Sequence, residues 1–116
     1  MIICAIDDLM FSIKISTAAK SLKANVYFER SADKLLETIR EKRPALVIFD
    51  LNSARLRPLD AILALKRDPD LSATKTLCYV SHVDTATIET ARAAGIDQVM
   101  ARSTFVAQLG DILTGA

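Results

Sequence analysis

A short run of apolar residues that ends in one carboxylate constrains the fold of this chain most. Residues 46–49 are uninterrupted Leu, Val, Ile and Phe, and Asp50 follows them directly. Such short apolar runs are typical of strands buried on both faces of a parallel sheet. Residues 1–6 repeat the pattern and end in Asp7 and Asp8. Because open α/β sheets bind ligands beyond the carboxyl ends of their strands, these three carboxylates mark the expected functional edge.

The rest of the chain alternates between strand and helix patterns. Strands are predicted over residues 1–6, 24–29, 46–50, 76–80 and 98–101, with the second more polar and therefore at an edge. An amphipathic helix pattern follows each of them. Strict alternation predicts a doubly wound, five-stranded parallel sheet with helices on both faces and right-handed crossovers. No linker or repeat interrupts the pattern, so we expect one domain over residues 1–116.

Several single residues predict where helices begin and end. Ser31, Asp84 and Ser103 each precede a helix pattern and are expected to cap it through the side-chain oxygen. Pro58 suits the first turn of a helix, where its missing N–H costs nothing. Gly95 is expected to end the helix that starts after Asp84.

Composition excludes several classes of function. The chain has 15 Lys and Arg against 14 Asp and Glu, so its net charge of +1 gives no basic field for nucleic acid. Aromatic residues make up 5% and Trp is absent, which argues against base-stacking surfaces. No apolar run approaches the roughly 20 residues that a membrane-spanning helix needs.

The cysteines and the first residues predict a cytoplasmic protein. Cys4 and Cys78 lie inside apolar strand patterns without metal-binding spacing, so both are expected to be buried and reduced. The start of the chain lacks the basic region of a signal peptide.

Polar groups are expected at four of the five strand ends. These groups are Asp7 and Asp8, Asp50, Ser81, and Arg102. Three neighbouring carboxylates repel one another unless a cation lies among them, and oxygen ligands favour Mg²⁺. A carboxylate beside such a metal, a hydroxyl and a cationic side chain can accept a phosphoryl group.

The chain resembles the receiver domains of two-component response regulators, and the likeness covers its whole length. The acid pair of that family matches Asp7 and Asp8, and its phosphoacceptor matches Asp50. Its third metal ligand, a backbone carbonyl, falls on Asn52, and its switch hydroxyl matches Ser81.

The same resemblance has departures. Arg102 replaces the lysine of the family, Ser103 replaces the proline that usually follows it, and Val99 replaces the aromatic switch residue. Without the proline, the bond between residues 102 and 103 has no reason to be cis. Arginine also presents a planar fork rather than a compact ammonium.

The resemblance implies a signalling module. Asp50 would take a phosphoryl group from a histidine kinase or phosphotransfer protein, assisted by Ser81 and Arg102. Mg²⁺ would bind Asp8, Asp50 and the Asn52 carbonyl, with Asp7 acting through water. A downstream protein or a second copy would bind the last two helices and the last strand, and no catalysis beyond self-phosphorylation and dephosphorylation is expected.

Other interpretations stay open at this point. The chain could be a pseudo-receiver, a docking module without phosphotransfer, and a permanent Asp50–Arg102 ion pair would suit that role. Asp7 and Asp8 could only cap the first helix, and His82 beside Ser81 could gate access to Asp50. A dehalogenase-type phosphatase would need a second acid at residue 52. A flavodoxin would need a hydroxyl- and glycine-rich loop at residues 7–8.

Overall fold

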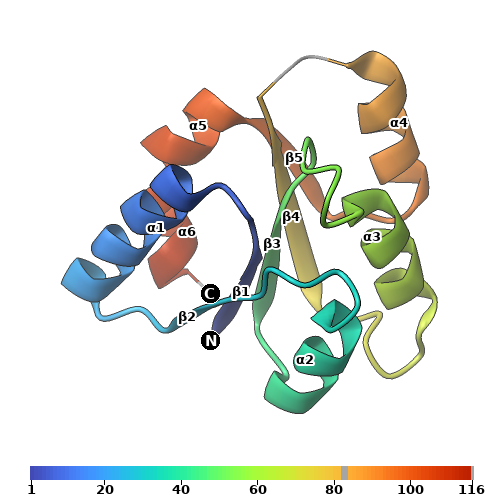
Figure 1. The fold of residues 1–116 in the computed structure, drawn as a ribbon, viewed down its shortest axis with the longest axis horizontal. Coiled ribbons are helices and arrows are strands. Elements are labelled where there is room, and N and C mark those ends of the chain that lie inside the picture. The colour runs from blue at the N-terminus through green and yellow to red at the C-terminus, as the bar shows by residue number, and fades with distance from the viewer. Residues whose placement is uncertain (82–83, 116) are drawn as a thin grey trace.

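The computed structural model describes residues 1–81 and 84–115, which form five strands and six helices (Figure 1). The strands are β1 (Ile2–Ala5), β2 (Val26–Phe28), β3 (Leu46–Asp50), β4 (Lys75–Val80) and β5 (Gln98–Ala101). The helices are α1 (Leu9–Leu22), α2 (Leu35–Lys42), α3 (Pro58–Arg67), α4 (Thr85–Ala93), α5 (Arg102–Ala107) and α6 (Leu109–Thr114). The predicted alternation is confirmed.

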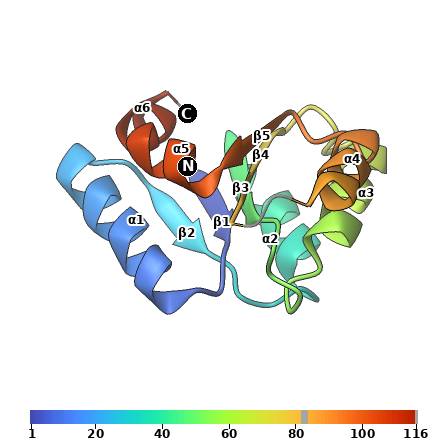
Figure 2. The same cartoon turned by 90° about the horizontal axis from the view of Figure 1, so that it is seen from above.

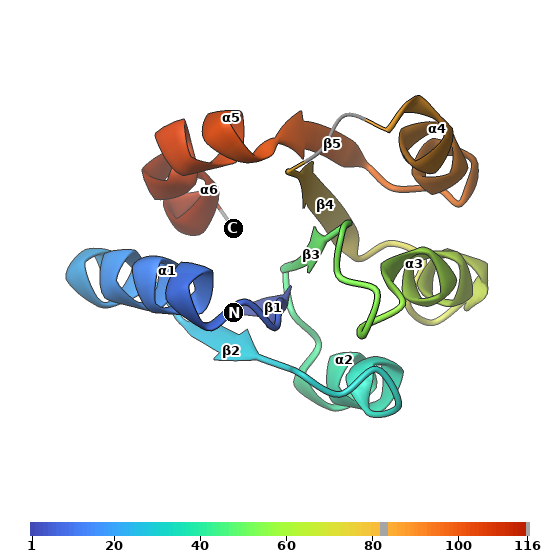
Figure 3. The same ribbon diagram turned by 45° about the horizontal axis from the view of Figure 1, so that its top comes forward.

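All strands are parallel and form one sheet in the order β2-β1-β3-β4-β5. Helices α1, α5 and α6 cover one face of the sheet, and α2, α3 and α4 cover the other (Figures 2 and 3). The predicted doubly wound sheet is therefore confirmed, as is the edge position of β2. Because the strands are parallel, their carboxyl ends lie along one edge of the sheet.

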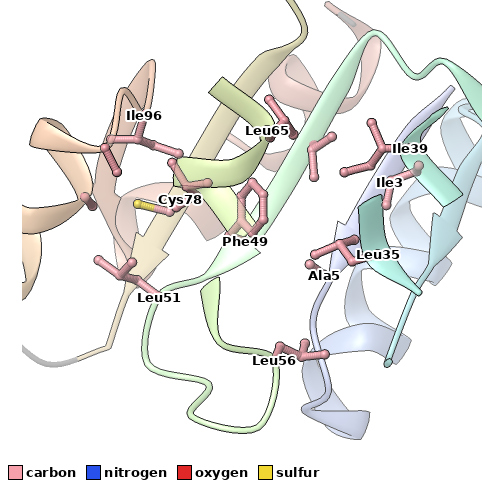
Figure 4. Close-up of a cluster of buried hydrophobic side chains, with 14 of the residues drawn as sticks. Ile3, Ala5, Leu35, Ile39, Phe49, Leu51, Leu56, Leu65, Cys78 and Ile96 are labelled. Atoms are coloured by element: carbon pink, nitrogen blue, oxygen red, sulfur yellow. The ribbon is translucent and has the colours of Figure 1, made fainter. Parts of the chain in front are cut away.

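The alternation of side chains along β3 divides the core into two layers. Val47 and Phe49 pack in the layer beneath α2, α3 and α4, where Figure 4 shows Phe49 among aliphatic side chains. Ile48 packs in the opposite layer, with residues of α1, α5 and α6. Asp50 comes two residues after Ile48, so its side chain faces the same layer as Ile48, toward α1 and α5.

Tyr79 occupies the centre of that second layer. It pairs in register with Asp50 and is fully buried. Its ring lies 4.9 Å from each of the rings of Phe11 and Phe105, centroid to centroid. Among the described residues, none gives its hydroxyl a hydrogen-bond partner. This aromatic cluster joins the start of α1 to α5.

The structure confirms some of the predicted helix ends and contradicts others. Asp84 caps α4 by accepting a hydrogen bond from the Thr87 backbone N–H at 3.3 Å. Pro58 stands in the first turn of α3, and Gly95, with φ of 102°, ends α4. These three predictions are confirmed.

The predicted caps at Ser31 and Ser103 are wrong. Helix α2 begins only at Leu35, because the buried Glu29 carboxylate holds the preceding turn by accepting bonds from the Ser31 N–H and the Thr38 hydroxyl. Ser103 lies inside α5, since the last extended residue is Ala101. The predicted final helix is also divided in two at residue 108.

The cysteine prediction is confirmed, because Cys4 and Cys78 are both buried and unpaired. Burial raises the pKa of the Cys4 thiol to about 12. Within residues 1–81 and 84–115, no helix combines the length and apolar character needed to cross a bilayer.

Candidate functional site

The predicted site residues come together at the carboxyl edge of the sheet. Asp7 and Asp8 follow β1, Asp50 ends β3, Ser81 follows β4, and Arg102 follows β5 directly. Arg102 contacts both Asp8 and Ser81, although 94 and 21 residues separate these pairs in the chain. A surface hollow of about 560 Å³ lies at the opposite edge beside residues such as Lys75 and Asp111, away from this group.

Asp50 is half-buried, as are Asp7 and Asp8. The Asn52 backbone N–H donates a hydrogen bond to Asp50 Oδ1 at 3.0 Å. Burial raises the pKa of the Asp50 carboxyl, and the negative charges of Asp7 and Asp8 raise it further against the opposing Asn52 bond. The three acids therefore lie close enough to sense one another, and a cation among them would relieve the repulsion.

Asp8 serves the helix and the site together. Its Oδ1 accepts a hydrogen bond from the Phe11 backbone N–H at 3.0 Å, so the predicted cap of α1 is confirmed. Its Oδ2 forms an ion pair with Arg102 Nη2 at 3.3 Å. The Phe11 bond is the main cause that lowers the pKa of Asp8, and the Arg102 charge adds to it.

Asp7 is held by a residue that the sequence did not point to. Ser53, only 7% exposed, donates its hydroxyl to Asp7 Oδ1 at 3.0 Å. The Leu56 backbone N–H in turn donates to Ser53 Oγ at 3.4 Å. The loop after β3 is thus tied to the end of β1. A serine three residues beyond the acceptor is an ordinary loop residue in sequence, and nothing in the pattern marks this contact.

Among the described residues, three contacts hold the Arg102 side chain. Besides Asp8, its Nη1 donates to Ser81 Oγ at 3.4 Å, and its Cζ lies 4.2 Å from the centre of the Phe11 ring. Among the described residues its ion pair is with Asp8, so the Asp50–Arg102 pair considered from the sequence does not form here. Because α5 begins at Arg102 itself, the start of a helix positions this side chain rather than a loop.

Asn52 joins two loops of the site through its side chain. Its Oδ1 accepts a hydrogen bond from the Ser81 backbone N–H at 2.6 Å. The sequence had assigned only the backbone carbonyl of Asn52 to a role, as a metal ligand, and that role stays a prediction. His82, the suggested gate, lies outside the described residues.

The chemistry of the donor set is that of a hard cation. Within the described parts of the chain, no three Asp, Glu, His or Cys side chains are grouped closely enough to hold a metal. A site here would therefore depend on the Asp8 and Asp50 carboxylates with the Asn52 carbonyl, and Asp7 would act through water. These are oxygen ligands only, which fits a hard cation such as Mg²⁺.

Comparison with known proteins gives a likeness in structure alone. The sequence matches no protein-family model and no curated protein. The structure superposes on a response regulator from Hahella chejuensis with a TM-score of 0.85 at 15% identity, covering 97% of this chain and 91% of the other. A signal receiver domain from Bermanella marisrubri gives 0.83 at 22% identity, covering 98% and 94%.

A third solved structure carries a metal. It is the receiver domain of a sensor histidine kinase from Pseudomonas aeruginosa, with a magnesium ion coordinated in its active-site cleft. Its TM-score is 0.83 at 16% identity, and the match covers 98% of this chain and 93% of that domain. The edge that gathers Asp7, Asp8, Asp50, Ser81 and Arg102 thus belongs to a chain with the fold of response-regulator receiver domains.

Proposed function

We propose that this chain, which has the receiver-domain fold, accepts a phosphoryl group on Asp50 from a histidine kinase or phosphotransfer protein. One observation carries the proposal: a half-buried carboxylate lies among two further acids, with a hydroxyl and a guanidinium at the same edge. Among the described residues, hydrogen bonds to Asp50 reach only Oδ1, so Oδ2 is left for attack on phosphorus.

The transfer itself needs little covalent chemistry from the protein. An Asp50 oxygen forms the new bond to phosphorus while the bond from phosphorus to the donor imidazole nitrogen breaks and leaves its electrons on that nitrogen. Catalysis is then mostly positioning and neutralisation of the phosphoryl oxygens. Ser81 and Arg102 are the groups that would bind those oxygens. No other catalytic activity is proposed.

Mg²⁺ is the cofactor that the donor set would take, through Asp8, Asp50 and the Asn52 carbonyl, with Asp7 through water. When bound, it would neutralise the acids and the incoming phosphoryl oxygens. Burial, with the charges of Asp7 and Asp8, raises the pKa of Asp50, and a divalent cation beside it would counter the repulsion among the three acids.

Two surfaces would serve the partners. The first turns of α1, beside the site, expose Met10 by 79%, Leu9 by 65% and Ile13 by 55%, an apolar surface suited to the phosphoryl donor. A downstream protein or a second copy would bind β5 and the outer faces of the last helices, near Val99 and Ala101.

The alternative is a pseudo-receiver that binds partners without phosphotransfer. The ion pair between Arg102 and Asp8 favours this function, because it already places a positive charge on a proposed metal ligand. Val99 adds to the case, since it supplies no aromatic ring to move in response to a phosphoryl group.

Incubation with acetyl phosphate and Mg²⁺ separates the two functions. We expect the intact mass to rise by one phosphoryl group, and the rise to vanish in Asp50→Asn and without Mg²⁺. Asp60→Asn, which makes the same change on the exposed first turn of α3, is the matched control and should react normally. An unmodified wild-type protein would favour the docking module. Modification of Asp50→Asn would mean that another residue accepts the phosphoryl group.

A further inference from the structure

The Arg102 guanidinium contacts two groups that the proposed function uses differently: Asp8 as a metal ligand and Ser81 as a donor to the phosphoryl oxygens. Nη2 contacts the proposed metal ligand Asp8 at 3.3 Å, and Nη1 contacts the Ser81 hydroxyl at 3.4 Å. The Cζ atom of the guanidinium lies over the Phe11 ring, 4.2 Å from the ring centre. These contacts hold the side chain against α1, and its ion pair there is not with the acceptor Asp50.

A metal ion at Asp8 would bind a carboxylate whose two oxygens already have partners. Asp8 Oδ1 already accepts the Phe11 backbone N–H that begins α1, and withdrawing it would leave a helix N–H without a partner. The remaining oxygen, Oδ2, is the one that Arg102 holds. A cation bound at Oδ2 would lie against the Arg102 guanidinium, and the repulsion between the two positive charges sets them in competition for that oxygen.

We infer that Arg102 and the divalent cation compete for Asp8, so that Arg102 acts as a latch on the empty site. In the absence of metal the guanidinium stays on Asp8, Ser81 and the Phe11 ring. Metal binding displaces it from Asp8 and frees it to turn toward a phosphoryl group on Asp50. The inference rests on the proposed metal site, and it makes the position of the Arg102 side chain depend on the metal.

Arginine suits this latch better than lysine. A planar guanidinium can stack on a ring while two of its nitrogens donate to different acceptors. A lysine ammonium is a point charge and cannot hold Asp8, Ser81 and the ring face in one geometry. The departure at residue 102 thus has a structural consequence of its own, since the guanidinium rests on the proposed metal ligand Asp8 and not on the acceptor Asp50.

Metal affinity tests the competition without any measurement of phosphotransfer. We expect Arg102→Gln to bind Mg²⁺ or Mn²⁺ about three- to tenfold more tightly than the wild type, as suits loss of a half-exposed ion pair and a ring contact. Phe11→Leu should tighten binding by about twofold with no change in charge, because it removes the ring face on which the guanidinium rests.

Lys42→Gln is the matched control. It removes one positive charge and a cation–ring contact, with Tyr27 at 4.3 Å, at the end of α2 near the other edge of the sheet. Calorimetric titration should give it the wild-type affinity. Circular dichroism of each variant establishes that it is folded before its affinity is compared.

Nuclear magnetic resonance follows the displacement directly. The Arg102 side-chain signals, shifted by the Phe11 ring in the free protein, should move to ordinary values as Mg²⁺ is added. Equal affinities in the wild type and Arg102→Gln, or Arg102 signals unmoved at saturation, would overturn the latch and leave the metal site standing. Absence of metal binding in both proteins would instead overturn the proposed function.

Discussion

Replacement of Asp97 tests how the start of β5, the strand that delivers Arg102, is fixed to the rest of the fold. Asp97 Oδ2 accepts bonds from Lys66 Nζ at 2.8 Å, from the Thr76 N–H at 2.8 Å and from the Thr76 hydroxyl at 2.9 Å. Thr76 is 1% exposed, so Asp97→Ala would leave its N–H without a partner in the interior. That loss costs about 1–3 kcal/mol.

The ion pair with Lys66 adds less. The Asp97 side chain is 40% exposed, and Lys66 keeps the carbonyls of Ser72 and Thr74 as acceptors, so we count under about 1 kcal/mol for the pair. We therefore expect Asp97→Ala to lower the free energy of unfolding by about 2–3 kcal/mol. Asp97→Asn, which keeps one oxygen but loses the charge, should cost about 1 kcal/mol.

Urea unfolding followed by circular dichroism measures the free energy of unfolding of both variants across a range of pH. Partial burial acts to raise the pKa of Asp97, but the bonds from Lys66 and Thr76 outweigh it and lower the pKa. A carboxyl with a lowered folded-state pKa contributes stability above its unfolded value, near 3.9, and loses it as the pH falls through the folded value. The deficit of Asp97→Asn should thus be complete at neutral pH and shrink in acid.

Asp111→Asn, at an exposed position in the first turn of α6, controls for loss of one acidic charge and should change stability little. The reasoning fails if Asp97→Ala is as stable as the wild type, or if the deficit of Asp97→Asn is unchanged in acid.

Three further substitutions test the backbone and the buried polar groups. Lys23 ends α1 at φ of 58°, so Lys23→Gly should raise the free energy of unfolding by about 0.5–1 kcal/mol, because glycine adopts this conformation without strain. Gly95→Ala should lower the free energy of unfolding by about 1–2 kcal/mol, since φ is 102° and the new Cβ would lie 3.1 Å from Lys66 Cγ. Thermal unfolding measures both changes. Thr38→Val should cost about 1–3 kcal/mol in urea unfolding, because it leaves the Glu29 carboxylate, 9% exposed, without its 2.6 Å bond. Equal stability in any of these variants would contradict the corresponding argument.

The sheet and the position of the site could be predicted from local patterns. The apolar run before Asp50 indicates a strand buried on both faces, and alternation with amphipathic helices indicates a parallel sheet covered by helices. In such a sheet the strand ends share one edge. The convergence of Asp8, Asp50, Ser81 and Arg102 on that edge therefore follows from topology, before any side chain is placed.

The partners within the site could not be predicted in the same way. Whether Arg102 meets Asp8 or Asp50 depends on side-chain rotamers and on the ring of Phe11, which the helix pattern marks only as an apolar core residue. Ser53 is likewise an ordinary loop residue until the fold brings it to Asp7. Such contacts join distant segments, and no local pattern encodes them.

The failed caps have a related cause. Ser31 carries a good capping side chain, but the buried Glu29 carboxylate captures the backbone of that turn and delays the helix to Leu35. Ser103 has the right residue type but lies two residues after Ala101, the N-cap, because Arg102 is already helical. Capping preferences are local, and tertiary contacts decide which residue is the last extended one.

Beryllofluoride binding followed by two-dimensional NMR is the decisive test of phosphoacceptance at Asp50, because this anion occupies the place of a phosphoryl group on a carboxylate. With Mg²⁺ present, we expect shifts at Asp50, Ser81 and Arg102 that saturate at one ligand per chain and are absent in Asp50→Asn. Spectra unchanged by Mg²⁺ and beryllofluoride, or the same shifts in Asp50→Asn, would contradict a phosphoacceptor at this edge of the sheet.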